Sequence, residues 1–226
     1  MNKKIIGVIL GLVILACILY FVFRSRRKHS VFVKSPQFLV DDYNKSFSQD
    51  KIYNSEHGIK YTYLFCIYIN NMPENGNWHS NYTDKKGIVS HFNSPNIFYL
   101  PDKHILEINV GYKDPDNTIS KYQFDIEDLL FQKWIHIGLV VKNRYASVFV
   151  NGKMIKATYL PNVPWFPNRT LYLGQKDNNF NGYIGYFEYF NDALSSDEIM
   201  KISKKRKMPS DLITYSEYYY KKYSKK

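Results

Sequence analysis

Cysteine is nearly absent from this chain, because only Cys17 and Cys66 occur among its 226 residues. Cys17 lies inside a long apolar segment, which leaves Cys66 without an intramolecular partner. A fold held together by disulfides is therefore excluded. The low cysteine count favours a domain that matures in a reducing compartment.

Motifs typical of catalytic and metal centres are also missing. The six histidines are scattered without the spacing of metal ligands, and no HExxH, CxxC, Walker or GxSxG pattern occurs. His136 lies two residues after Trp134, on the same face of a predicted strand. We expect a core or half-buried histidine there, with the core packing around Trp134, rather than a general base.

Acidic residues are missing from the first 29 positions, and the excess of basic over acidic residues is confined to the two ends of the chain. The net charge is +11, yet residues 30–200 carry 16 basic and 18 acidic side chains. A nucleic-acid-binding domain needs a basic folded face, so no nucleic-acid partner is expected. Residues 204–226 form a basic tail rich in Tyr and Lys, and both basic ends favour anionic lipid headgroups as partners.

An uncharged apolar segment covers residues 5–23, preceded by a short flank over residues 1–4. As a helix, its 19 residues would span about 28 Å, close to the thickness of a bilayer core. The segment is longer than the apolar core of a cleaved signal peptide. We therefore predict an uncleaved transmembrane helix with the lipid bilayer as its partner, followed by a basic juxtamembrane linker over residues 24–46.

The orientation of this single-pass anchor is left open by two opposing signals. Lys and Arg are more numerous after the apolar segment than before it, which favours the cytoplasmic side for the domain. Glycosylation triplets at Asn44, Asn81 and Asn168 favour the opposite side. Gly7 and Gly11 form a small-xxx-small pair that would allow a homodimer through the membrane helix.

From residue 47 the chain is a series of short β-like runs separated by Asn, Gly, Pro and Asp. The odd-numbered residues from Ile135 to Val141 fall on one face of a strand and are all apolar. Asn151-Gly152 predicts a two-residue hairpin, because a type I′ turn needs positive φ at both central residues. The predicted strands cover residues 61–69, 86–92, 96–100, 104–112, 134–141, 145–150, 153–160, 170–175 and 182–190.

One helix signal closes the domain. Ser195 and Glu198 form a capping box, Lys204–Lys207 place cations at the helix C-terminus, and Pro209 ends the helix. The predicted fold is all-β: an antiparallel jelly-roll sandwich with one short C-terminal helix, preceded by a single transmembrane helix.

Five segments carry a family resemblance: YTYLFCIYI, KWIHIGLVV, VFVNGKMI, LYLGQ and FNGYIGYFEYFNDALSSDEI. Their order and spacing resemble the concanavalin A-like lectin/glucanase superfamily, specifically its laminin G-like or pentraxin-like jelly rolls, over residues 47–203. Cys66 departs from the family, whose strand usually carries Trp there. The sequence is rich in Asn, Lys, Tyr and Ile, and in this it is most similar to versions of the domain in large DNA viruses of eukaryotes. The fold-defining residues are Trp134, Asn151, Gly152, Gly174, Gly182, Ser195 and Glu198.

The resemblance implies a binding or structural module, because the family includes glycan binders, protein binders, Ca²⁺-assisted modules and glucanases. We predict a membrane-anchored, non-enzymatic module that recognises a glycan or a protein, in a virion or a host intracellular membrane. One alternative is a purely structural tether between a membrane and a protein shell of capsid type. The other is a glycoside hydrolase acting on a β-glucan-like polymer.

Candidate contact residues lie in loops rich in Asn, Asp and Pro, where large rings are either lids over the core or ligand contacts. The candidates for ligand binding are Trp78, His79, Trp165, Phe166, Asn178 and Asn179. The two oxygen-rich loops at residues 113–118 and 175–182 suggest a Ca²⁺ site with Asp114, Asp116 and Asp177 as ligands. For hydrolysis, the nearest pair of acids is Asp125 and Glu127, which lacks a third acid at position 129.

Overall fold

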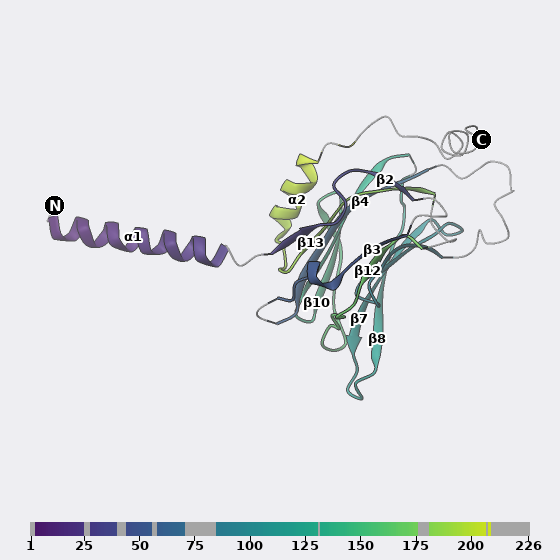
Figure 1. Cartoon of the computed structure of the whole chain (residues 1–226), viewed down its shortest axis with the longest axis horizontal. Coiled ribbons are helices and arrows are strands. Elements are labelled where there is room, and N and C mark those ends of the chain that lie inside the picture. The colour runs from purple at the N-terminus through teal and green to yellow at the C-terminus, as the bar shows by residue number, and fades with distance from the viewer. Residues whose placement is uncertain are drawn as a thin grey trace.

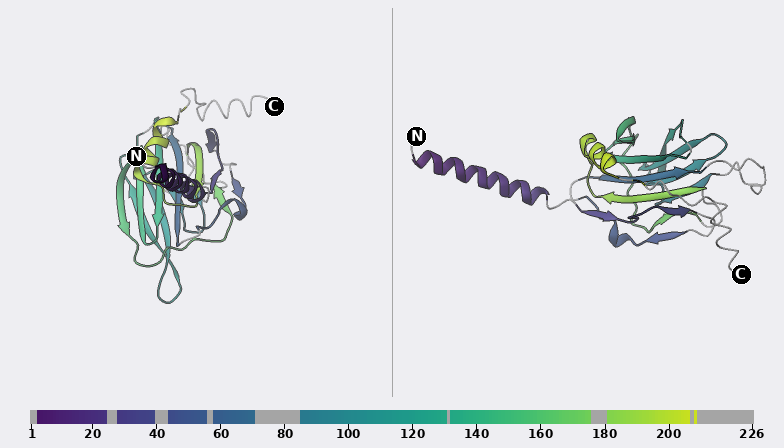
Figure 2. Two further views of the ribbon diagram at one scale, coloured as in Figure 1. Left: turned by 90° about the vertical axis from the view of Figure 1, so that its left-hand side faces the viewer. Right: turned by 90° about the horizontal axis from the view of Figure 1, so that it is seen from above.

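The computed structural model describes residues 3–24, 28–39, 44–55, 58–70, 85–130, 132–175, 181–206 and 208. Within them, two antiparallel sheets stack face to face as a sandwich, and Figure 1 and Figure 2 show the two layers from three sides. The predicted all-β sandwich with one short C-terminal helix is confirmed.

The first sheet has seven strands in the described residues, and the second has six. The first runs in the order β1 (His29–Val31), β13 (Gly182–Phe190), β4 (Lys60–Ile69), β9 (Trp134–Lys142), β10 (Tyr145–Val150) and β11 (Lys153–Tyr159), with β2 (Gln37–Leu39) also paired to β13. The second runs in the order β3 (Lys45–Phe47), β12 (Leu171–Leu173), β5 (Lys86–Ser90), β6 (Asn96–Leu100), β7 (Ile105–Lys113) and β8 (Ile119–Ile126). A 3₁₀ turn (Gln49–Lys51) follows β3.

The core between the sheets follows the two-residue period of the strands. The odd-numbered residues from Ile135 to Val141 on β9 are buried, as are Tyr63, Phe65 and Ile67 on the paired strand β4. Large apolar side chains of β6, β7 and β8 meet them from the second sheet. This alternation was predictable because each of these faces is continuous and apolar.

The turn between β10 and β11 has the conformation that its sequence predicts. Asn151 has a φ of 49° and Gly152 a φ of 80°. The Asn151 side chain accepts a hydrogen bond of 2.9 Å from the backbone N–H of His136, which fixes the turn against β9. A Cβ on Gly152 would approach Met200 of the C-terminal helix, so glycine also allows the helix to pack here.

The outer face of the first sheet is covered by helix α2 (Ser196–Lys205), as Figure 1 shows. Ile199 and Leu194 pack there against Leu64, Val140 and Phe149 in a second apolar cluster. The predicted capping box is present: Ser195 Oγ accepts from the Glu198 N–H, and the Glu198 carboxylate accepts from the Ser195 N–H at 2.9 Å. Pro209 lies outside the described residues.

A helix α1 (Lys3–Arg24) stands apart from the sandwich at the N-terminal end (Figure 1). Among the residues that the structure describes, no helix is both long enough and apolar enough to cross a membrane. The membrane crossing predicted for residues 5–23 is therefore not shown. Nothing lies within 4 Å of a Cβ built on Gly11, and pairing through Gly7 and Gly11 stays a prediction.

The predicted linker over residues 24–46 requires a correction. Strands β1 and β2 lie in this segment and pair with β13, so residues 28–39 belong to the first sheet. These strands have only three residues each, which is too short for an alternating pattern to stand out in the sequence.

The capping box gives a stability prediction. Replacing Ser195 with Ala removes the side-chain acceptor of the first helical turn and is expected to lower the free energy of unfolding by about 1 kcal/mol. Urea unfolding followed by tryptophan fluorescence measures this change. Ser196→Ala, one position later and exposed, is the matched control. An equal loss in both variants would contradict a capping role.

Candidate functional site

A hollow of about 570 Å³ opens at one end of the sandwich, beside the ends of β5 and β12. We call it the Arg169 hollow. It is lined by Gln49, Ser90, Phe92, Asn93, Asn96, Asn168, Arg169, Thr170 and Tyr172. Its volume lies within the range of pockets that hold small ligands. None of these nine residues was proposed from the sequence as a ligand-binding, metal-binding or catalytic residue, although Asn168 begins one of the glycosylation triplets.

Two aromatic rings and one cation dominate the surface of this hollow. Phe92 and Tyr172 are 46% and 43% exposed, which is unusual for rings of this size. The guanidinium of Arg169 lies 4.3 Å from the centroid of the Phe92 ring. Four amide side chains and two hydroxyls complete the lining. The hollow thus offers apolar faces for stacking next to groups that both donate and accept hydrogen bonds.

The backbone beside the hollow is held in an unusual conformation. Phe92 and Asn93 have φ values of 47° and 66°, in the left-handed region that a bulky residue such as Phe rarely adopts. The Asn96 side-chain oxygen accepts from the N–H groups of His91 and Asn93, both at 3.1 Å. Its amide group donates to the Asn93 side chain at 2.8 Å. Asn96 therefore stabilises the turn that presents Phe92 to solvent.

His91 joins the two loops of the hollow from below. Its ring is fully buried, with Nε2 at 3.1 Å from the Arg169 carbonyl and Nδ1 at 2.9 Å from the Ser94 carbonyl. Burial lowers the pKa of His91, despite the opposing effect of hydrogen bonding to the Ser94 and Arg169 carbonyls. Nδ1 also lies 3.1 Å from the Tyr63 hydroxyl. A neutral ring has a single N–H and therefore donates to only one of the two carbonyls.

A second hollow, the Trp165 pocket, has a volume of about 390 Å³. It is lined by Asn54, Ser55, Gly58, Ile59, Lys60, Tyr61, Lys113, Val163, Pro164, Trp165, Phe166 and Tyr189. Trp165 is half-buried, and its indole Nε1 is buried without a hydrogen-bond partner. The ammonium of Lys113 lies 5.1 Å from the centroid of the indole ring.

The predicted contact residues Trp165 and Phe166 are both half-buried and both line this pocket. Phe166 also packs against the core through Tyr61 and His91, with ring centroids 5.1 and 5.6 Å apart. Trp78, His79, Asn178 and Asn179 lie outside the described residues.

The carboxylates proposed for Ca²⁺ serve the turn between β7 and β8. Asp114 accepts from Ser120, and Asp116 accepts from the N–H and hydroxyl of Thr118 at 3.0 and 2.7 Å. These hydrogen bonds from Thr118 lower the pKa of Asp116. No group of three metal-ligating side chains occurs in the part of the chain that the structure describes. Asp177 lies outside that part, so the Ca²⁺ site stays a prediction.

Asp125, considered above with Glu127 as the acid pair for hydrolysis, lies opposite a different acid in the sheet. Asp125 on β8 is the register partner of Glu107 on β7, whereas Glu127 follows the end of β8. Burial raises the pKa of Glu107, but hydrogen bonds from Lys85 at 2.5 Å and Asn109 at 2.7 Å outweigh it and hold this pKa below its usual value. Glu107 is therefore ionised, unlike the acid that protonates a leaving group.

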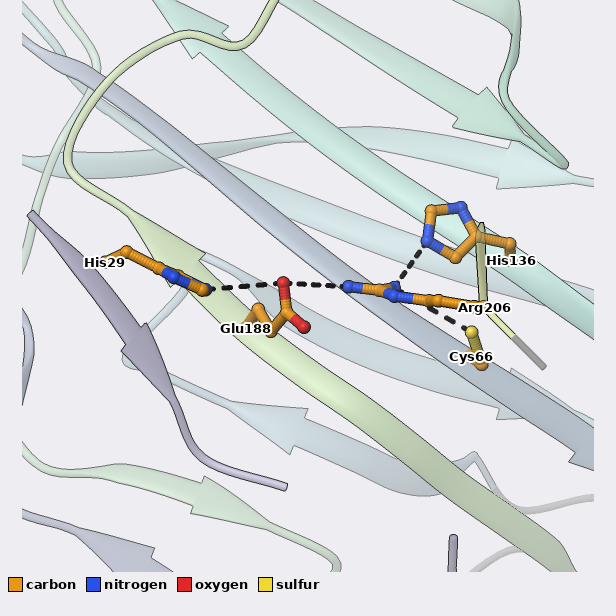
Figure 3. A network of polar contacts seen from close by, with 5 residues as sticks. All are labelled: His29, Cys66, His136, Glu188 and Arg206. Carbon is orange, nitrogen blue, oxygen red and sulfur yellow. Dashed lines mark hydrogen bonds and ion pairs between the residues drawn. The ribbon is translucent and has the colours of Figure 1, made fainter. Parts of the chain in front are cut away.

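Figure 3 shows a polar network on the outer face of the first sheet, centred on Arg206. This residue follows α2, and its side chain is only 6% exposed. Its guanidinium lies 2.8 Å from Glu188, which also lies 3.3 Å from Nε2 of His29. It also donates to Nε2 of His136 and lies 3.9 Å from the Cys66 sulfur.

The network does not provide a nucleophile. Burial raises the pKa of the Cys66 thiol to about 12 and lowers the pKa of His136 to about 3, the latter with help from Arg206. A reactive Cys–His pair needs the opposite shifts, toward thiolate and imidazolium. The small Cys66 instead leaves space for the guanidinium, in a position where the family resemblance predicts Trp.

The position expected for Trp134 also needs a correction. It shares the outer face with His136, where its ring centroid lies 5.5 Å from that of Tyr68 and 6.3 Å from that of Tyr183. It is half-buried there and takes no part in the core between the sheets. The inward face of β9 belongs to the odd-numbered residues, so an even-numbered Trp cannot reach that core.

The sequence and the fold are both similar to those of known proteins. Residues 49–200 match a family model described as the concanavalin A-like lectin/glucanases superfamily. A search of curated proteins found no match. Among solved structures, the botulinum neurotoxin serotype D binding domain is 14% identical with a TM-score of 0.56, over 79% of this chain and 46% of that one.

Two further solved structures are similar. The botulinum neurotoxin serotype G binding domain is 15% identical with a TM-score of 0.53, over 79% of this chain and 46% of that one. The binding domain of Paraclostridial Mosquitocidal Protein 1 is 16% identical with a TM-score of 0.50, over 78% and 47%. This chain spans less than half the length of these domains, and at such identities the likeness shows the fold alone.

The buried His136 predicts a dependence of stability on pH. Its pKa of about 3 in the folded protein lies below the value of about 6.5 expected in the unfolded chain. The contribution of neutral His136 to the free energy of unfolding is therefore fully present above pH 6.5. As pH falls from 6.5 toward 3, this contribution is lost by up to about 1.4 kcal/mol per pH unit. His136→Gln is expected to make this dependence shallower, while His91 contributes equally to both proteins.

Urea unfolding at pH 8, 6 and 5 measures this effect. His136→Gln is expected to destabilise the protein at pH 8, because Arg206 loses its ring acceptor, and to approach the parent protein as pH falls. Parallel pH profiles for the two proteins would contradict the buried, neutral state of His136.

Proposed function

This chain belongs to the concanavalin A-like lectin/glucanases superfamily, and on that premise we propose that it is a non-enzymatic binding module that recognises saccharides through the Arg169 hollow. The observation that carries the proposal is the combination of two exposed rings with amide and hydroxyl side chains around one hollow. Sugar rings have apolar faces that stack on aromatic rings, and hydroxyl groups that both donate and accept hydrogen bonds. The lining of the hollow matches both properties.

The conformation and exposure of Phe92 are further support for a binding site in the Arg169 hollow, beyond the types of residue that line it. A phenylalanine with positive φ carries a conformational cost, and exposure of its ring to water gives no compensating burial. Strained residues concentrate at binding sites, where contact with a ligand compensates for their cost. The hydrogen bonds of Asn96 and the buried His91 hold the turn in place without a ligand. The hollow is therefore preformed, which reduces the entropy lost on binding.

Hydrolysis of a β-glucan-like polymer is the rival function. Its supporting observation is the register pairing of Glu107 and Asp125 on the second sheet. The ion pair of Glu107 with Lys85 argues against it, because it stabilises the ionised form of Glu107, which cannot protonate a leaving group. Release of reducing sugar by the purified protein, abolished by Asp125→Asn, would favour the rival and overturn the non-enzymatic proposal.

We also propose that α1 attaches the module to a membrane, where several copies would bind a polyvalent ligand with increased avidity. Support comes from the uncharged residues 5–23 and from the exposed apolar side chains that α1 carries. The exposed ones are Ile9, Leu12, Val13, Ile14, Leu15, Ile18 and Leu19. The resemblance to proteins of large DNA viruses suggests that this membrane belongs to a virion or an infected cell, and a protein shell beneath it would be the partner of a structural tether.

Saccharide binding is testable on an immobilised glycan panel, followed by titration of the strongest hit. Phe92→Ala and Tyr172→Ala are each expected to weaken that binding about tenfold, a loss of about 1.4 kcal/mol, because each removes a stacking surface. Tyr159→Ala is the matched control, since Tyr159 is 74% exposed on β11 and does not line the hollow. Equal binding by all four proteins would contradict the assignment of the hollow.

Membrane attachment has a separate test. The full chain is expected to stay with the membrane fraction during an alkaline carbonate wash, whereas a chain lacking residues 1–24 is expected in the supernatant. Release of the full chain by carbonate would refute an integral anchor. Equal retention of both chains would place the membrane contact in the folded domain or the basic tail.

A further inference from the structure

We infer that the ligand is an extended anionic polysaccharide, carrying carboxylate or sulfate groups, that runs across both the Arg169 hollow and the Trp165 pocket. This inference rests on the proposed saccharide-binding function and specifies its ligand. It depends on three observations: the same pairing of cation and ring in each hollow, the adjacency of the hollows, and the sign of the charges around them.

Each hollow presents a cation above an aromatic ring. Arg169 lies 4.3 Å from the Phe92 centroid, and Lys113 lies 5.1 Å from the Trp165 centroid. The ring holds the cation through its quadrupole and leaves the N–H groups at its edge available. Neither cation has an ion-pair partner within the described part of the chain, so an incoming anion would not have to displace a carboxylate.

The two hollows are neighbours, joined through Gly111 on β7. The Gly111 N–H donates to the carbonyl of Asn93, which lines the Arg169 hollow. The Gly111 carbonyl accepts from the N–H of Trp165 at 2.8 Å, and Trp165 lines the other pocket. A Cβ on Gly111 would lie 3.1 Å from the Asn93 carbonyl and 3.5 Å from the Trp165 Cβ. Only one residue therefore separates the walls of the hollows, a distance that successive sugar units can bridge.

The charges of the lining residues have one sign. Among the described residues, Lys60, Lys113 and Arg169 line the two hollows, and no Asp or Glu lines either. Three described acids are sequence neighbours of lining residues: Asp50 accepts from Ser48, Asp114 accepts from Ser120, and Glu188 pairs with Arg206 on the outer face of the first sheet. Glu56, which follows Ser55, lies outside the described residues. This local excess of positive charge contrasts with the 16 basic and 18 acidic side chains of residues 30–200.

An anionic polymer also supplies a counter-charge to the Trp165 pocket. The cations of this pocket, Lys60 and Lys113, are donors without acceptor capacity. A carboxylate or sulfate oxygen would accept hydrogen bonds from them. A neutral polymer would supply weaker acceptors and would leave the cations without a counter-charge.

The test uses the full chain in detergent with three probes: heparin as a sulfated polymer, polygalacturonate as a carboxylated polymer, and dextran as a neutral polymer. Arg169→Gln and Lys113→Gln are each expected to weaken binding of an acidic polymer about tenfold, with a larger loss in the double variant. Binding is expected to fall as salt rises from 50 to 500 mM. Lys153→Gln, an exposed position on β11, removes the same charge elsewhere and is expected to change little. Melting temperatures confirm that the variants fold.

The outcomes separate the two proposals. Binding of dextran or another neutral glycan that depends on Phe92, without binding of acidic polymers, would overturn this inference and leave the proposed function standing. Absence of binding to all saccharides would overturn both. An equal loss in Lys153→Gln, or loss in only one of the two hollow variants, would show non-specific attraction or a single site and would also overturn the extended site.

Discussion

Burial of β4 on both faces is the constraint on which the rest of this structure depends. Its inward side chains, such as Phe65, form the core between the sheets, and its outward Leu64 and Cys66 are also inaccessible to solvent. An antiparallel sheet usually leaves one face to water. Here the outer face needs a cover, which α2 provides with Ile199 and which Arg206 completes above Cys66. The space beside the small Cys66 side chain of β4 is therefore filled by the guanidinium of Arg206, the residue that follows α2.

Local patterns were sufficient to predict much of the fold. The alternation along β9, the two positive φ values at Asn151 and Gly152, and the capping box at Ser195 each depend on residues close together in sequence. Predictions failed where the determining contacts are distant. The short strand β1 pairs with β13, about 160 positions later, and the outward Trp134 packs against rings from two other strands.

The candidate site was less predictable than the fold for the same reason. Of the proposed aromatic contacts within the described residues, Trp165 and Phe166 both line a pocket, and Phe166 also packs against the core. The larger hollow depends on His91, whose ring nitrogens contact the nearby Ser94 carbonyl and the Arg169 carbonyl, 78 positions away from His91. No spacing rule connects such residues. The local signal was a phenylalanine directly before the turn-forming sequence Asn93-Ser94-Pro95, and its meaning requires the φ of Phe92 and the neighbouring Arg169.

The attachment of β1 has a mechanical consequence. Any tension applied through α1 reaches the sandwich first at β1, a strand of three residues whose one pairing partner among the described strands is β13. His29 stacks on Phe190 at 4.2 Å and contacts Glu188, the same carboxylate that holds Arg206. A pulling force that detaches β1 would therefore disturb the covering of the outer face before it reached the core. The residues that line the Arg169 hollow belong to the second sheet and its loops, so this hollow does not depend on the pairing of β1. The Trp165 pocket does, because it is lined by Tyr189 of β13, the register partner of Ser30 on β1.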